Sequence, residues 1–92
     1  MSEYEEGLIG QYVDQVQALA VRAEANEDVI AKVETVVANA VEHFRVVKSS
    51  DLQANLSAFK GRLSIASEVA HSSQPKFKET LQYAAKICPT KI

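Results

Sequence analysis

The side chains of this 92-residue chain that are best suited to chemistry are two histidines and one cysteine. His43 and His71 lie near the ends of expected helices, where a histidine could serve as a general base or a phosphoacceptor. A histidine at the edge of a helical core is usually structural, however. Cys88 has no partner for an internal disulfide, and one cysteine with two distant histidines falls short of a structural zinc set. Free cysteine is among the most buried residue types, so we expect Cys88 in the core.

The acidic residues do not follow a metal-binding pattern. A di-metal site in a helical bundle needs Glu-x-x-His pairs on inward faces. The one match, Glu68 with His71, projects away from the apolar side of its helix. The chain also lacks a glycine-rich phosphate loop, a serine nucleophile elbow and paired cysteines. We therefore expect a protein that is not an enzyme, with no catalytic residue, metal or cofactor.

A short motif resembles part of a known signature. Phe59, Lys60 and Gly61 are similar to a fragment of the signature of histidine phosphotransfer domains, which are small four-helix bundles of similar size. In that family a histidine lies three residues before the lysine, and Ser57 occupies that position here. The resemblance covers three residues and lacks the phosphoacceptor, so it implies at most a relative that binds without transferring phosphate.

The elements that would position these residues are helices. Through residues 9–47 apolar side chains recur at alternating steps of three and four, which places them on one stripe because a helix turns every 3.6 residues. No Gly or Pro interrupts the chain from residue 11 to residue 60. The stripe consists of Ile9, Tyr12, Val16, Leu19, Ala23, Ile30, Val33, Val37, Ala40, Phe44 and Val47.

Asn26, the polar residue on this series, leaves two folds open. Asn is a favourable N-cap, and Glu27 and Asp28 would then lie in the first turn of a second helix, so that residues 1–48 form a hairpin. Alternatively, one helix of roughly 68 Å passes straight through. Asn26 would then fix the register of a rod that dimerises beside a shorter helical hairpin. The hairpin is favoured because a chain of this length seldom builds around such a rod.

Further signals mark the ends of the later helices. Ser50 with Gln53 has the form of a capping box, Pro75 suits the first position of a helix, and Pro89 would end the last one. The predicted fold is all-α, an antiparallel up-and-down four-helix bundle in one domain, residues 1–92. Its helices lie near 2–25, 27–48, 51–71 and 75–88, followed by a tail, 89–92. We expect the second helix, rich in valine, to be the most buried.

Composition and charge narrow the class of protein. With 47% hydrophobic and 24% charged residues the chain is typical of globular domains, and no apolar run is long enough for a bilayer. Its acidic start is unlike a secretory signal, so we expect a cytoplasmic protein with no membrane partner.

The charge is unevenly distributed along the chain. Residues 1–45 carry nine acidic and three basic side chains, net −6, whereas residues 46–92 carry three acidic and seven basic, net +4. The alternative function is therefore a nucleic-acid-binding or phosphorelay-type regulator that uses the basic half through Lys76, Lys78 and Lys86. The overall pI of about 5.6 makes nucleic acid the less favoured partner.

Four apolar side chains lie away from the helical stripes. They are Val21, Val46, Ile65 and Tyr83, one on each expected helix. Single exposed apolar residues are normal, but four on four helices are candidates for contact with a partner. We therefore predict a non-catalytic protein-interaction module, such as a small adaptor, assembly chaperone or inhibitor. It should self-associate as a homo-oligomer, because a bundle this small gains core by dimerising.

Overall fold

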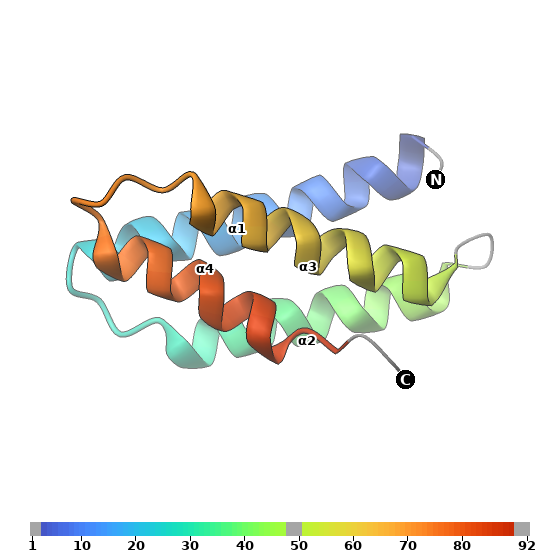
Figure 1. The fold of residues 1–92 in the computed structure, drawn as a ribbon. Coiled ribbons are helices and arrows are strands. Elements are labelled where there is room, and N and C mark those ends of the chain that lie inside the picture. Colours follow the sequence, from blue (N-terminus) through green and yellow to red (C-terminus); the bar gives the residue numbers. More distant parts are fainter. Residues whose placement is uncertain (1–2, 48–50, 90–92) are drawn as a thin grey trace.

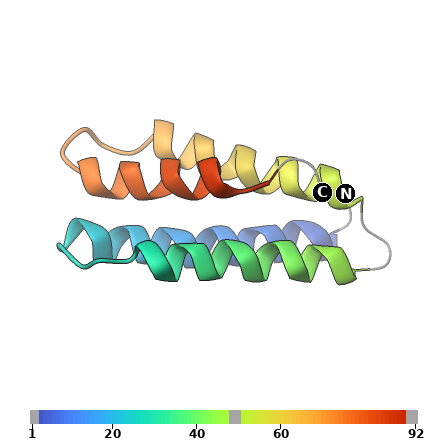
Figure 2. The same cartoon turned by 90° about the horizontal axis from the view of Figure 1, so that it is seen from below.

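The computed structural model describes the backbone of residues 3–47 and 51–89, and side chains in these ranges from residue 6 onward. Its helices are α1 (Glu3–Glu24), α2 (Ile30–Val46), α3 (Leu52–Glu68) and α4 (Pro75–Ile87). They run alternately in opposite directions (Figure 1), and α1 with α2 forms one layer while α3 with α4 forms the other (Figure 2). The predicted antiparallel four-helix bundle is confirmed, and the long rod is excluded because the chain reverses between α1 and α2.

The reversal after α1 depends on Asn26, but not as the sequence suggested. Asn26 has a φ of 72°, in the left-handed region that Asn tolerates. Its N–H donates to the Ala23 carbonyl at 2.9 Å, and the Glu27 N–H donates to the Arg22 carbonyl at 3.1 Å. This pair of hydrogen bonds is a Schellman motif, which closes the C-terminus of a helix. Asn26 therefore ends α1, and the prediction that it caps the next helix is wrong.

The starts of the next two helices also differ from the prediction. α2 begins at Ile30, three residues later than the predicted Glu27. Val29, the residue before it, is buried and makes no side-chain cap. At α3 the capping residue is Asp51, whose Oδ1 accepts from the Ala54 N–H at 3.1 Å, and not Ser50. Ser50, the beginning of the first predicted helix at residue 2 and the tail beyond residue 89 lie outside the described residues.

The core follows the predicted stripes except at Ile30, which is exposed, and it contains aromatic rings that contact one another. Phe44 of α2 and Phe59 of α3 meet edge to face with ring centroids 5.8 Å apart, and Tyr12 of α1 meets Phe44 at 6.0 Å. Such edge contacts are the favoured geometry for aromatic pairs. The three rings therefore join α1, α2 and α3 in the interior.

The most closely packed helix is α4, and the prediction that α2 would be the most buried is wrong. Four of the 17 residues of α2 are buried, against four of the 13 residues of α4. α4 lies close along both α1 and α3, where the small side chains of Ala84 and Ala85 are buried. In α2, by contrast, Ile30 and Val46 are exposed. The valines of α2 did not make it the most buried helix, because α2 approaches the other helices less closely than α4 does.

The Glu24 carboxylate of α1 caps the N-terminus of α4. Glu24 Oε2 accepts from the backbone N–H groups of Lys76 at 2.9 Å and Phe77 at 3.0 Å. The first N–H groups of a helix have no partner within the helix and attract negative charge. The Lys76 ammonium also donates to Asn26 Oδ1. The end of α1 and the start of α4 are thus tied together across the bundle.

Candidate functional site

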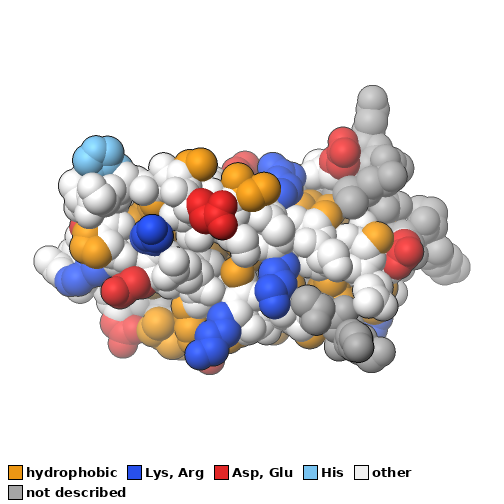
Figure 3. Space-filling view, viewed as in Figure 1, with side chains coloured by type: hydrophobic (Ala, Val, Ile, Leu, Met, Phe, Trp, Pro, Cys, Tyr) orange, Lys and Arg blue, Asp and Glu red, His pale blue; other side chains and the backbone are white. Residues whose placement is uncertain are grey.

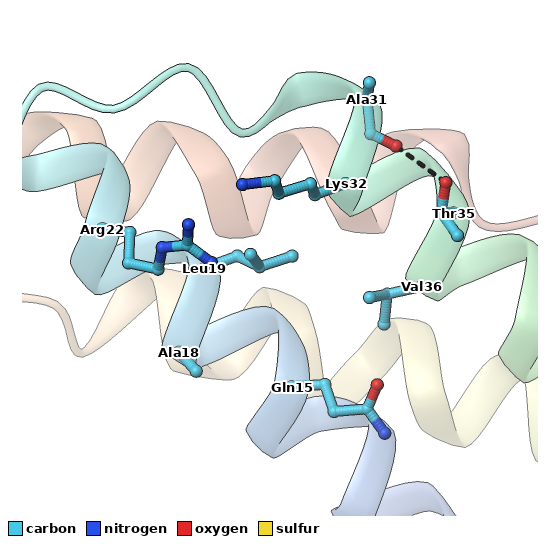
Figure 4. A pocket seen from close by; sticks show the side chains of 8 residues that line it. All are labelled: Gln15, Ala18, Leu19, Arg22, Ala31, Lys32, Thr35 and Val36. Carbon is cyan, nitrogen blue, oxygen red and sulfur yellow. Dashed lines mark hydrogen bonds between the residues drawn. The ribbon is translucent and has the colours of Figure 1, made fainter.

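An open, mainly apolar groove of about 480 Å³ lies between α1 and α2 (Figure 4). It is lined by side chains of these two helices alone. They are Gln15, Ala18, Leu19, Arg22, Ala31, Lys32, Thr35 and Val36. Its volume is within the range of small binding sites, which are concave and apolar with a few polar groups.

Short side chains border the groove on both helices. Ala18 and Ala31 are exposed and end at Cβ, so they leave the space between the helices open. Leu19, which is buried, and Val36, which is half-buried, provide apolar surface at the base. Thr35 directs its hydroxyl back to the Ala31 carbonyl at 3.0 Å, within α2. The accessible surface of the groove is therefore largely hydrocarbon.

The charged groups of the groove are both cations and lie at one end. Arg22 is in the last turn of α1 and Lys32 in the first turn of α2, whereas Gln15 and Val36 line the other end without charge. The Arg22 Nε pairs with Glu27 Oε2 at 2.7 Å. Lys32 makes no ion pair within the described part of the chain, and its side chain extends over the groove toward Arg22 (Figure 4). Lys32 is thus the available positive charge of the groove.

Three of the predicted partner-contact residues are exposed as expected, but none lines this groove. Val21, Val46 and Ile65 are 59%, 63% and 61% exposed, on α1, α2 and α3. The structure adds Val69, which the sequence analysis did not single out, and Ile30, which it wrongly placed on the apolar stripe. The spacing could have shown Val69, because it follows Ile65 by four residues and so lies on the same side of the helix.

Tyr83, the fourth predicted contact residue, takes part in the fold. It is half-buried against the core, and its hydroxyl donates to Glu34 Oε2 of α2 at 2.9 Å. The hydrogen bond to Glu34, burial and the charge of Glu34 all raise the pKa of Tyr83 above its ordinary value. Tyr83 therefore links α4 to α2.

Two of the three lysines considered for nucleic-acid contact share hollows with acidic side chains. Lys76 donates to Asn26 and shares a hollow with Glu27, Asp28 and Glu79. Lys86 lies in a second hollow, which Glu79 also lines, and Lys78 is half-buried. On the face shown in Figure 3, acidic and basic side chains are intermixed. The structure does not gather Lys76, Lys78 and Lys86 into a separate basic patch.

The histidines and the cysteine are engaged in the fold. His43 Nδ1 is hydrogen-bonded to the Tyr12 hydroxyl at 2.9 Å, and His71 Nδ1 lies 2.7 Å from Ser73 Oγ in the connection between α3 and α4. Cys88 is buried, which confirms its predicted place in the core. Burial raises the pKa of its thiol, with a smaller opposing effect from Lys60. Among the described residues, no three His, Cys, Asp or Glu side chains gather as metal ligands.

Comparison of the chain with known protein families, curated proteins and solved structures yields no match. Within the described ranges, every helix is too short or too polar to cross a membrane.

Proposed function

We propose that the protein is a non-catalytic protein-interaction module that binds an amphipathic helix in the groove between α1 and α2. The observation that carries this proposal is the groove itself, about 480 Å³ of mainly apolar surface lined by two helices. Burying the apolar face of a helix in such a groove is a recurring mode of peptide recognition. The roles that fit are those of an adaptor, an assembly chaperone or an inhibitor in the cytoplasm.

The dimensions of the groove suggest what the bound helix presents. From Gln15 to Arg22 the lining of α1 extends about 10 Å, which is two helical turns. Two apolar side chains one turn apart would fill this length and cover Leu19 and Val36. Because the contact is short, we expect weak binding, with a Kd of roughly 10 µM to 1 mM, as for small transient interfaces.

A non-catalytic role is supported by the state of the reactive side chains. The Nδ1 atoms of His43 and His71 are occupied by hydrogen bonds to neighbouring side chains, and Cys88 is buried with a raised thiol pKa. A raised pKa lowers the fraction of reactive thiolate at neutral pH. None of these three residues lines the groove.

The test uses a short, uncharged amphipathic peptide with leucines spaced by three and four residues, titrated into isotopically labelled protein. Amide chemical shifts should change along the groove, and binding should be lost in the double variant Ala18→Gln, Ala31→Gln, whose longer side chains fill the space. Ala38→Gln is the matched control, because Ala38 is exposed on α2 but does not line the groove. Unchanged groove amides, or equal binding by the filled variant, would contradict the proposal.

A further inference from the structure

The outer face of α3 has the features of a helix that the groove is proposed to bind. Ile65 and Val69 are 61% and 77% exposed and lie one helical turn apart. Gly61, four residues before Ile65, is on the same side, and a Cβ built there would meet no atom within 4 Å. This face, defined by Gly61, Ile65 and Val69, is apolar and uncovered, with a glycine that lets another helix approach closely.

A carboxylate flanks this face, where the groove offers an ammonium group. Glu68 is exposed and follows Ile65 by three residues, so it lies at the edge of the α3 face. In the groove, Arg22 is already paired with Glu27, and Lys32 is the available cation. An apolar pair beside one carboxylate thus matches an apolar groove beside one ammonium group.

The net charges of the two halves favour the same pairing. The α1–α2 half belongs to residues 1–45, with a net charge of −6, and the α3–α4 half to residues 46–92, with +4. Placing the groove of one copy against the α3 face of another brings opposite charges together, whereas two grooves facing each other would bring two acidic halves together. Such complementarity selects partners and orientation.

We infer that the partner of the groove is a second copy of this chain, which inserts Ile65 and Val69 of its α3 between α1 and α2, with Glu68 paired to Lys32. This inference rests on the proposed function and names the occupant of the same groove. The groove and the α3 face belong to different layers of the bundle (Figure 2), so one copy can use both. Copies then add head to tail into a ring or a filament.

The decisive experiment mixes two variants, each lacking one of the two surfaces. Ala18→Gln with Ala31→Gln fills the groove, and Ile65→Asp with Val69→Asp removes the α3 face at exposed positions, leaving the core unchanged. By sedimentation equilibrium, the mean mass of the wild-type protein and of Ala38→Gln should rise with concentration, while each double variant alone stays monomeric. An equimolar mixture should form a one-to-one complex, because each variant keeps the surface that the other needs.

A charge exchange tests the contact between Lys32 and Glu68. Lys32→Glu alone or Glu68→Lys alone should lower the association constant about fivefold, and the two together should restore it to within about twofold. Lys86→Glu is the control, since this exposed lysine lies in neither surface. Additive losses in the double variant would overturn the pairing of these two residues.

The outcomes separate this inference from the proposed function. If either double variant still assembles alone, or their mixture stays monomeric, the head-to-tail pairing is wrong. If the wild-type chain is monomeric at every concentration while the leucine peptide binds, the groove serves a helix of another protein and only the inference fails. If the peptide also fails to bind, the proposed function fails as well.

Discussion

Alanine lies in two kinds of helix–helix contact in this bundle, one closely packed and one open. Where α4 lies along α1 and α3, Ala84 and Ala85 are buried and the helices approach closely. Between α1 and α2, Ala18 and Ala31 are exposed, and the space beyond them is open. An alanine allows close approach, but it does not bring a neighbouring helix into place.

The two contacts differ in the other side chains that lie between the helices. At the end of α1–α2 remote from the groove's cations, the rings of Tyr12, His43 and Phe44 occupy the interface. Large side chains set a wider separation between helix axes than small ones do. The contacts of α4 include the buried small side chains of Ala84 and Ala85, and its N-terminus is tied to Glu24 of α1. The contacts of α4 are thus close, whereas the contact between α1 and α2 leaves open the groove proposed to bind a helix.

The largest expected effect comes from enlarging one alanine in each contact. Ala84→Leu forces extra carbon atoms into a filled interface and should lower the free energy of unfolding by about 1–3 kcal/mol. Ala18→Leu places the same atoms in open space and should change it by less than about 0.5 kcal/mol. Urea unfolding followed by circular dichroism measures both. Equal losses would show that the groove is not the looser contact.

A smaller effect is expected from removing the link between α1 and α4. Glu24→Ala leaves the N–H groups of Lys76 and Phe77 without their acceptor and should cost about 1 kcal/mol, as for loss of a helix cap. Hydrogen exchange at these two amides should accelerate. Glu27→Ala is the control, because it removes only an exposed ion pair and should cost less than about 0.5 kcal/mol. Similar losses in both variants would contradict the capping role of Glu24.

The smallest effect is a loss of stability at alkaline pH through Cys88, at the end of α4. Burial raises the thiol pKa above its ordinary value of 9.0, so the folded state favours the protonated thiol. As the pH rises above 9, the unfolded chain releases its proton first. Stability therefore falls until the folded thiol also ionises, by at most about 1.4 kcal/mol per pH unit for one proton.

Urea unfolding at pH 8 and pH 10 measures this dependence, with Cys88→Ala as the comparison. The variant should lose stability less steeply between the two pH values, although it is less stable at both. The raised pKa of Tyr83 acts in the same direction above pH 10, and Tyr83→Phe separates its share. A slope unchanged by Cys88→Ala would exclude the thiol as the cause.

The exposure of several side chains was predictable from the sequence, because burial and exposure alternate with the helical period. Val21, Val46 and Ile65 lie off the apolar stripes and are exposed, and Cys88 lies on a stripe and is buried. The groove was not predictable in this way. Leu19 belongs to a stripe and Ala18 does not, and nothing in their spacing shows that α2 stands away from both.

The sequence by itself determined the four helices, their amphipathic faces and the turn before Pro75, because these depend on residues within a few positions of one another. Only the tertiary structure decided that Glu24 caps a helix 52 residues away and that α4 packs more closely than α2. The same holds for the groove. Such features depend on which distant side chains meet and how far apart they hold two backbones, and local periodicity carries no information about either.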